Sequence, residues 1–165
     1  MNKAEVDNYC ESLPVLEIEV PEDKIEIDMM LRPTEPEDGV AQYWPFYEKC
    51  NPNELFGNMD FKFGGRGGKV IINLALDLSA IPGRDLEFAL STSRKLDGIL
   101  ALSPDFKHQF KTTAKRVDGR YTELKIVIKD KEKRPDNFKF LWLCECVDGG
   151  MHFVSGDPRA RFEPE

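Results

Sequence analysis

The chain has few residues of the kinds that carry out chemistry. Its 165 residues include two histidines, His108 and His152, and four cysteines. The HExxH, GxSxG and HRD patterns of metalloproteases, hydrolases and kinases are absent. An enzyme needs a reactive group and neighbours that tune it, and no local pattern supplies both. A Cys–His pair formed only in space stays an alternative, but we expect no catalytic residue, no cofactor and no enzymatic activity.

The sequence also lacks a run of about 18 apolar residues, which a membrane-spanning helix would require. Its N-terminal residues carry acidic side chains, whereas a secretion signal begins with basic residues and continues into an apolar stretch. We therefore expect no membrane association and a location inside the cell, in the cytoplasm or the nucleus. Residues 1–12 are expected to be a flexible segment and residues 13–165 a single domain.

Cysteine is too sparse for a disulfide scaffold of the secreted kind. The four cysteines are Cys10, Cys50, Cys144 and Cys146. The last two lie two residues apart in an apolar segment, so on a strand they would share one face, and we expect no disulfide between them. We expect reduced thiols. A zinc site formed by Cys144, Cys146 and His152 is a weaker alternative, because zinc sites favour a CxxC knuckle in a loop. No metal ligand is predicted.

Hydrophobic residues recur with a period of two along most of the chain, which is typical of strands. The pattern predicts strands within residues 69–78, 85–92, 121–129 and 137–147. Residues 96–103 fit a short helix or another strand. Long segments of helical period are scarce, so few or no helices are expected.

Turn residues separate the predicted strands. Asp148 and two glycines follow residues 137–147 and predict a hairpin. The glycine-rich residues 64–68 predict a second hairpin, and residues 21–23 a further turn. About seven to nine short strands with such turns favour an antiparallel two-sheet β-sandwich, immunoglobulin-like or jelly-roll-like. A barrel is the alternative.

Charge is distributed unevenly. The net charge is −7, yet residues 1–60 hold 15 Asp and Glu against four Lys and Arg. Residues 107–134 form a basic stretch, which could meet a phosphate backbone or an acidic peptide. Its candidate binding residues are Lys107, Lys111, Lys115, Arg116 and Arg120. The competing interpretation is an ordinary solvated face, since lysines on strands also prevent aggregation.

Two further segments are candidate binding sites. Residues 41–47 hold four aromatic residues, which either plug the end of the sandwich or form an exposed binding loop. These are Tyr43, Trp44, Phe46 and Tyr47. Residues 63–69 place Arg66 among four glycines at the tip of the expected hairpin. The P-loop pattern is not met there, because the lysine at its end is followed by valine and no helix is expected.

The function predicted from these features is a non-catalytic module that binds another protein through its loops or through a sheet edge. The alternative is a nucleic-acid-binding domain that uses the basic stretch 107–134. The sequence predicts no oligomeric state.

Overall fold

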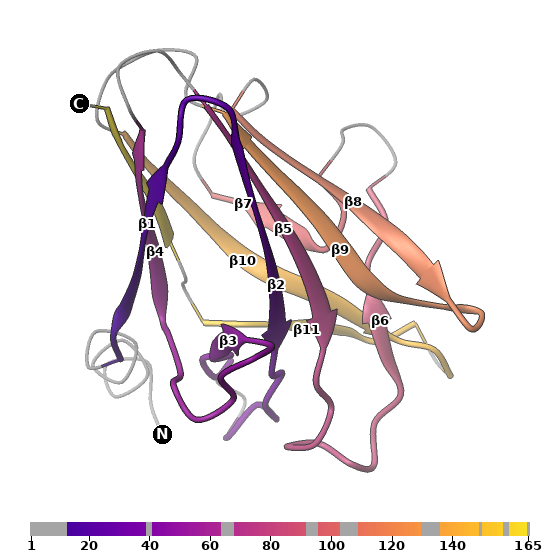
Figure 1. The fold of residues 1–165 in the computed structure, drawn as a ribbon. Coiled ribbons are helices and arrows are strands. Elements are labelled where there is room, and N and C mark those ends of the chain that lie inside the picture. Colours follow the sequence, from indigo (N-terminus) through magenta and orange to yellow (C-terminus); the bar gives the residue numbers. More distant parts are fainter. Residues whose placement is uncertain are drawn as a thin grey trace.

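The structure, a computed structural model, describes residues 13–38, 41–63, 68–91, 96–102, 109–129, 136–148, 150–156 and 159–164. All regular secondary structure within these ranges is β-strand, and the described residues form no helix (Figure 1). The all-β prediction is therefore confirmed. The segment 1–12, predicted to be flexible, lies outside the described residues.

Twelve strands occur in the described part of the chain. They are β1 (Val15–Val20), β2 (Lys24–Leu31), β3 (Phe46–Glu48), β4 (Asn58–Phe63), β5 (Lys69–Leu76), β6 (Leu86–Phe88), β7 (Ile99–Ala101), β8 (Phe110–Val117), β9 (Arg120–Lys129), β10 (Asp136–Cys146), β11 (His152–Val154) and β12 (Arg159–Pro164). The four segments predicted from the period of two correspond to β5, β6, β9 and β10. The ambiguous segment 96–103 contains a strand, β7.

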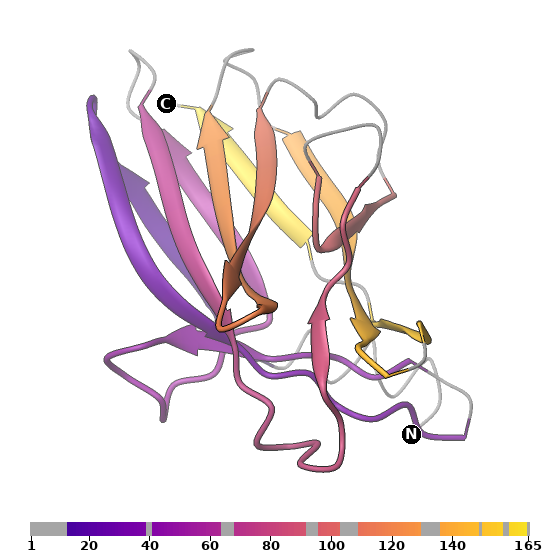
Figure 2. The same ribbon diagram turned by 90° about the vertical axis from the view of Figure 1, so that its right-hand side faces the viewer.

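The strands form two sheets (Figures 1 and 2). The first sheet has the order β1-β4-β12-β10-β11, with β6 and β7 also paired to β10. The second has the order β3-β2-β5-β9-β8. The expectation of purely antiparallel sheets is wrong, because β1 with β4, β4 with β12, and β2 with β5 are parallel pairs.

Two of the parallel pairs, β1 with β4 and β2 with β5, arise from two crossings between the sheets. The chain leaves the first sheet after β1 and enters the second at β2, and it repeats this step from β4 to β5. The turn at residues 21–23 and the connection from β4 to β5 therefore join different sheets, and the β4–β5 hairpin predicted at the glycines is wrong. Gly68 shows how closely the crossings pack: at its φ of +134°, a Cβ would lie 2.4 Å from the carbonyl oxygen of Pro21.

Two other turns do form hairpins. β8 and β9 pair antiparallel around Asp118 and Gly119, whose φ angles of 50° and 82° fit a two-residue type I′ turn. The predicted hairpin between β10 and β11 is confirmed by their antiparallel register, in which Cys144 lies opposite Phe153. Both turns use residues that tolerate a positive φ, which explains why they were recognisable locally.

Inward-facing side chains of both sheets meet in one hydrophobic cluster. On β9 the inward residues are Leu124, Ile126 and Ile128, none more than 1% exposed. On β10, Phe140 packs edge-to-face on Trp142, with ring centroids 4.9 Å apart. Each large apolar side chain buried in this way stabilises the fold by about 1.5–3 kcal/mol before entropy is counted.

Candidate functional site

The aromatic segment 41–47 lies in the interior. The exposed fractions are 2% for Tyr43, 0% for Trp44, 1% for Phe46 and 6% for Tyr47. The Tyr43 hydroxyl donates to the carbonyl oxygen of Phe56 at 3.0 Å, so its polar end is satisfied inside the protein. The core plug is therefore the correct alternative for these rings, and the exposed binding loop is wrong. An adjacent proline is tolerated because β3 lies at the edge of its sheet.

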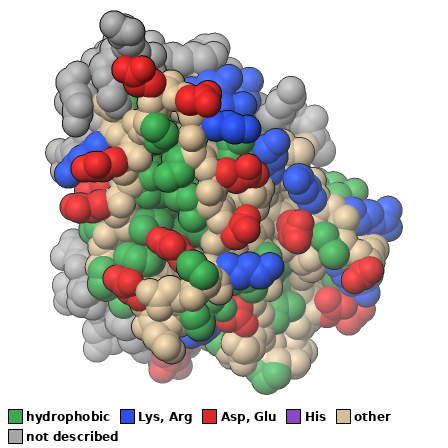
Figure 3. Space-filling model, viewed as in Figure 1, with side chains coloured by type: hydrophobic (Ala, Val, Ile, Leu, Met, Phe, Trp, Pro, Cys, Tyr) green, Lys and Arg blue, Asp and Glu red, His purple; other side chains and the backbone are tan. Residues whose placement is uncertain are grey.

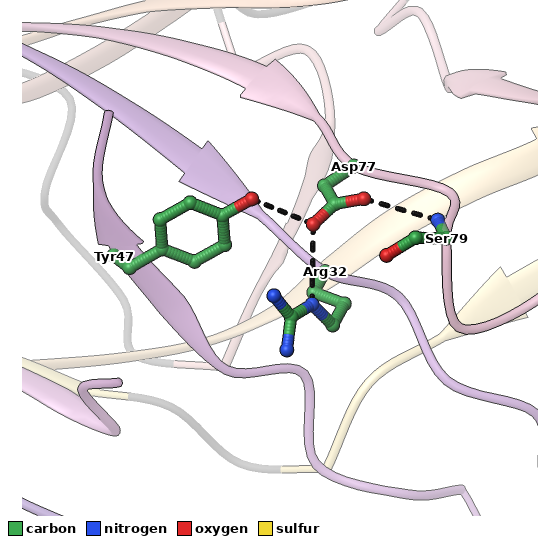
Figure 4. Close-up of polar contacts among 4 residues, drawn as sticks. All are labelled: Arg32, Tyr47, Asp77 and Ser79. Atoms are coloured by element: carbon green, nitrogen blue, oxygen red, sulfur yellow. Dashed lines mark hydrogen bonds and ion pairs between the residues drawn. The ribbon is translucent and has the colours of Figure 1, made fainter. Parts of the chain in front are cut away.

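Hydrogen bonds around Asp77 join three elements of the second sheet (Figure 4). Asp77 follows β5, Tyr47 lies on β3 and Arg32 follows β2. Asp77 Oδ2 accepts from the Tyr47 hydroxyl at 2.6 Å and from Arg32 Nε at 3.1 Å. Its Oδ1 accepts from the backbone amide of Ser79 at 3.0 Å. The Arg32 guanidinium also lies 5.2 Å from the centroid of the Tyr47 ring. We call Arg32, Tyr47 and Asp77 the clamp.

The clamp keeps its carboxylate ionised. Burial alone would raise the pKa of Asp77, but the hydrogen bonds that it accepts outweigh burial and lower this pKa to about 2. Burial raises the pKa of Tyr47, and the hydrogen bond to Asp77 raises it further. A carboxylate with three donors and so low a pKa is a poor proton acceptor near neutral pH. The clamp therefore suits a structural role, in which it fixes β3 against the C-terminal half of β2.

Coverage of β2 by β3 ends halfway along the strand. β3 pairs with residues 29–31 only. There the inward-facing Met29 and Leu31 are 1% and 0% exposed. Ile25 and Ile27 face the same core from the uncovered half of β2 but are only partly buried. The core thus reaches solvent between β1 and β2, where hydrophobic side chains are visible between the two strands (Figure 3).

The uncovered half of β2 presents backbone groups at its edge. The carbonyl oxygen of Asp28 accepts from the amide of Lys49, and the amide of Arg32 donates to the carbonyl oxygen of Pro45. The even-numbered residues of β2 therefore point their backbone groups toward the β3 side, since direction alternates along a strand. By this alternation, the amides of Glu26 and Asp28 and the carbonyls of Lys24 and Glu26 face an edge that no described strand covers. We call this stretch, Lys24 to Asp28, the free edge.

The two sheets also meet along a second line, or seam, beside β8 on the other side of the molecule. This seam is closed. Segment 96–98 lies along β8, where Leu96 bridges to Thr112. The carboxylate of Asp97 accepts from the amide of Ala114 on β8 at 3.0 Å and from the amide of Ser91 at 2.7 Å. The half-buried carboxylate of Asp97 thus occupies a backbone donor that an edge strand would otherwise present. Of the two seams between the sheets, the described residues leave open the one beside the free edge.

The basic stretch is only partly brought together. Lys111 and Lys115 are exposed on the outward side of β8. Lys125 and Lys129 continue this surface on β9, and in the described residues none of the four lysines has an ion-pair partner. We call these four side chains the lysine face.

The other predicted basic residues have different surroundings. The Arg116 guanidinium lies 5.9 Å from the centroid of the Tyr121 ring. Arg120 is paired with Asp85 at 3.1 Å. The predicted sites at Arg66 and Lys107 lie outside the described residues.

The outer surface of the second sheet is acidic at its other end, along β2. Glu26 and Asp28 point outward from β2, and the side-chain amide of Asn73 on β5 donates to both carboxylates, at 3.0 and 3.1 Å. A depression of about 330 Å³ lies on this surface, lined by these three residues together with Lys115 and Glu123 among others. The outer surface of the second sheet is therefore acidic along β2 and basic along β8 and β9.

Cys144 and Cys146 belong to the core side of β10. Cys144 is fully buried, Cys146 packs against the core, and burial raises the pKa of the Cys144 thiol. His152 lies opposite Glu145, which points to the other face of the sheet, and the two side chains are 3.6 Å apart. The three residues of the zinc alternative therefore do not converge. Among the described residues, no group of three potential ligands is placed to hold a metal ion.

No protein-family model and no curated protein matches the chain. The described part of the chain holds no helix with the length and apolar character needed to cross a membrane. Sequence reasoning missed the free edge, because Ile25 and Ile27 follow the same alternation as Met29 and Leu31.

Proposed function

We propose that this protein is a non-catalytic β-sandwich module that binds another protein, and that it accepts an extended segment of that partner at the free edge. The supporting observation is the change in burial along one strand. Inward side chains of β2 are fully buried where β3 covers the edge and partly exposed where it does not. An added strand would bury Ile25 and Ile27 as β3 buries Met29 and Leu31.

Strand addition also satisfies the backbone. An extended segment that pairs with the free edge would bond the amides and carbonyls that face it, and main-chain bonds of this kind supply affinity in strand-addition complexes. The closed seam at β8 strengthens the proposal, because Asp97 blocks the equivalent addition there. The clamp holds β3 in place over the C-terminal half of β2, so it determines where the free edge ends.

The test is selection of extended peptides from a random library against the immobilised protein, followed by binding assays with Glu26→Pro. Proline at position 26 removes an amide that faces the free edge and leaves the β5 ladder its donors. We expect selected peptides to bind the unaltered protein and Glu26→Gln but not Glu26→Pro. Peptides that bind Glu26→Pro as well as the unaltered protein would show that the free edge is not the site.

We also propose that the two sheets form a sandwich and that the protein is located inside the cell. Two sheets with separate edge strands and one shared core favour a sandwich over a closed barrel. Cys50, Cys144 and Cys146 are free thiols, which suits a reducing compartment inside the cell.

A second candidate function is the binding of nucleic acid by the lysine face. The observation that favours it is the set of four lysines on neighbouring strands that form no ion pair with any residue the structure describes. Affinity for a DNA or RNA duplex should then fall steeply with salt, and Lys111→Gln with Lys115→Gln should reduce the slope by about two. Absence of binding at about 50 mM salt would rule this candidate out.

A further inference from the structure

The surroundings of the free edge specify the chemistry of the segment that fits it. We propose that the partner segment is a short strand in which aliphatic residues alternate with lysine or arginine. This inference rests on the proposed function, because it names the partner of that same edge. It follows from the two faces that an added strand would present, one toward the core and one toward solvent.

The inward face calls for aliphatic side chains. Ile25 and Ile27 form one wall of the opening, and behind them Val70 and Ile72 of β5 are 0% and 1% exposed. Across the opening, the inward residues of β1 are Leu16, Ile18 and Val20. None of these side chains can form a hydrogen bond. A polar residue placed there would lose its water without gaining a hydrogen-bond partner, which disfavours binding.

The outward face calls for positive charge. Three residues of the free edge point outward: Lys24 at its start, then Glu26 and Asp28, so its central and C-terminal part is acidic. Each of the two acidic residues accepts one hydrogen bond from Asn73, which leaves further acceptor positions on both carboxylates. On β1, across the opening, Glu17 and Glu19 are exposed. Opposite charges on neighbouring strands stabilise a sheet and like charges destabilise it, so lysine or arginine fits and glutamate does not.

The number of unpaired backbone groups along the free edge limits the length of the partner segment. Lys49 already donates to the carbonyl oxygen of Asp28, so the pairing must end there. At the other end β2 begins at Lys24, just after the crossing. The free edge therefore accommodates about four to six partner residues, the length of an ordinary short strand.

The test uses three labelled heptapeptides with capped ends, and binding is followed by fluorescence anisotropy at about 0.1 M salt, where surface charges are partly screened. The first alternates valine and lysine, the second alternates valine and glutamate, and the third is the first with alternate amides N-methylated to block pairing. We expect the valine–lysine peptide to bind and the other two to bind at least about tenfold more weakly, a difference of about 1.4 kcal/mol.

Variants of the protein separate charge from edge pairing. Glu26→Gln with Asp28→Asn should weaken binding of the valine–lysine peptide about fivefold, since opposite charges on neighbouring strands stabilise their pairing. The matched control, Asp118→Asn with Asp148→Asn, changes the net charge equally at two exposed turns and should leave binding unchanged. Circular dichroism and thermal unfolding establish that each variant is folded.

The outcomes distinguish the two proposals. If the valine–glutamate peptide binds as tightly as the valine–lysine peptide and the N-methylated peptide does not bind, the partner chemistry is wrong and the edge proposal stands. If the N-methylated peptide binds as well as its parent, pairing at the edge is wrong, and both proposals fall. If the valine–lysine peptide does not bind at all, the partner chemistry is overturned, and the library selection alone decides the edge. Equal weakening by the control pair would show long-range attraction to an acidic protein instead of recognition.

Discussion

The hydroxyl of Tyr47 donates to Asp77 at 2.6 Å, and this bond ties β3 to the end of β5 across the intervening strand β2. Arg32 donates to the same carboxylate oxygen from the end of β2. The position of β3 is therefore fixed from two sides. Because β3 determines how much of β2 is covered, this small polar cluster also sets the extent of the free edge.

Replacement of Asp77 by asparagine should destabilise the protein and change its acid sensitivity. The pKa of Asp77 is lowered from 3.8 to about 2 in the folded protein. A depressed pKa contributes stability above the unfolded value, and this contribution, about 2 kcal/mol, is lost as the pH falls from about 4 to 2. Urea unfolding at pH 7 and at pH 2 should show that Asp77→Asn costs more at pH 7.

Tyr47→Phe provides the control for this prediction. It removes one of the three donors to Asp77 and keeps the buried ring. We expect Tyr47→Phe to lower the free energy of unfolding by about 1 kcal/mol at pH 7. The loss of stability between pH 7 and pH 2 should then be smaller than in the unaltered protein. An Asp77→Asn variant that loses stability equally at both pH values would contradict the assigned role of the carboxylate.

Local patterns in the sequence predicted the strands, and contacts between distant residues decided how the strands assemble. The alternation of hydrophobic and polar residues in 121–129 correctly predicts which side chains of β9 face the core. The glycines at 64–68 signal a change of direction, but a hairpin and a crossing between sheets use the same residues. Only packing of β4 and β5 in different sheets distinguishes them.

The candidate site could not be found from the sequence for a similar reason. Asp97 and Ala114 are 17 residues apart, and Tyr47 and Asp77 are 30 apart, so no local signal connects them. The aromatic segment 41–47 was ambiguous because ring-rich segments with a proline occur in cores and in interfaces alike. Burial of Trp44 follows from long-range packing alone.

Asp97→Ala should open the second seam. The variant leaves the amides of Ala114 and Ser91 without their acceptor, and we expect a loss of about 2–4 kcal/mol, since each is a hydrogen bond to a charged group. It also uncovers part of the β8 edge, so concentration-dependent association should increase. Light scattering and urea unfolding measure the two effects. Asp97→Asn, which retains one carbonyl acceptor, should lie between the variant and the unaltered protein.

Gly68→Ala should be strongly destabilising because the two crossings touch at this residue. A Cβ would lie 2.4 Å from the carbonyl oxygen of Pro21, and the φ of +134° is already unfavourable for alanine. Gly119→Ala shares a positive φ, +82°, but meets nothing within 4 Å. We expect about 1 kcal/mol for Gly119→Ala and more than about 2 kcal/mol for Gly68→Ala. Equal losses in urea unfolding would show that the crossings are not in contact.

Alanine at positions 27 and 72 should separate the open part of the core from its closed part. The two isoleucines are partners on neighbouring strands, but Ile72 is 1% exposed and Ile27 is only partly buried. We expect Ile72→Ala to cost about 3–4 kcal/mol and Ile27→Ala about half as much, since the cost follows the burial that is lost. Urea unfolding in the absence of peptide provides the comparison.

The same pair of variants connects stability to binding. If an added strand covers the opening, Ile27 becomes buried in the complex, so Ile27→Ala should weaken the valine–lysine peptide about fivefold or more, which corresponds to about 1 kcal/mol of lost burial. Ile72 is buried in both states, so Ile72→Ala should leave the affinity of the folded protein unchanged. Anisotropy titrations at a temperature where both variants are folded measure this difference. Equal affinities for the two variants would mean that the bound peptide does not lie over Ile27.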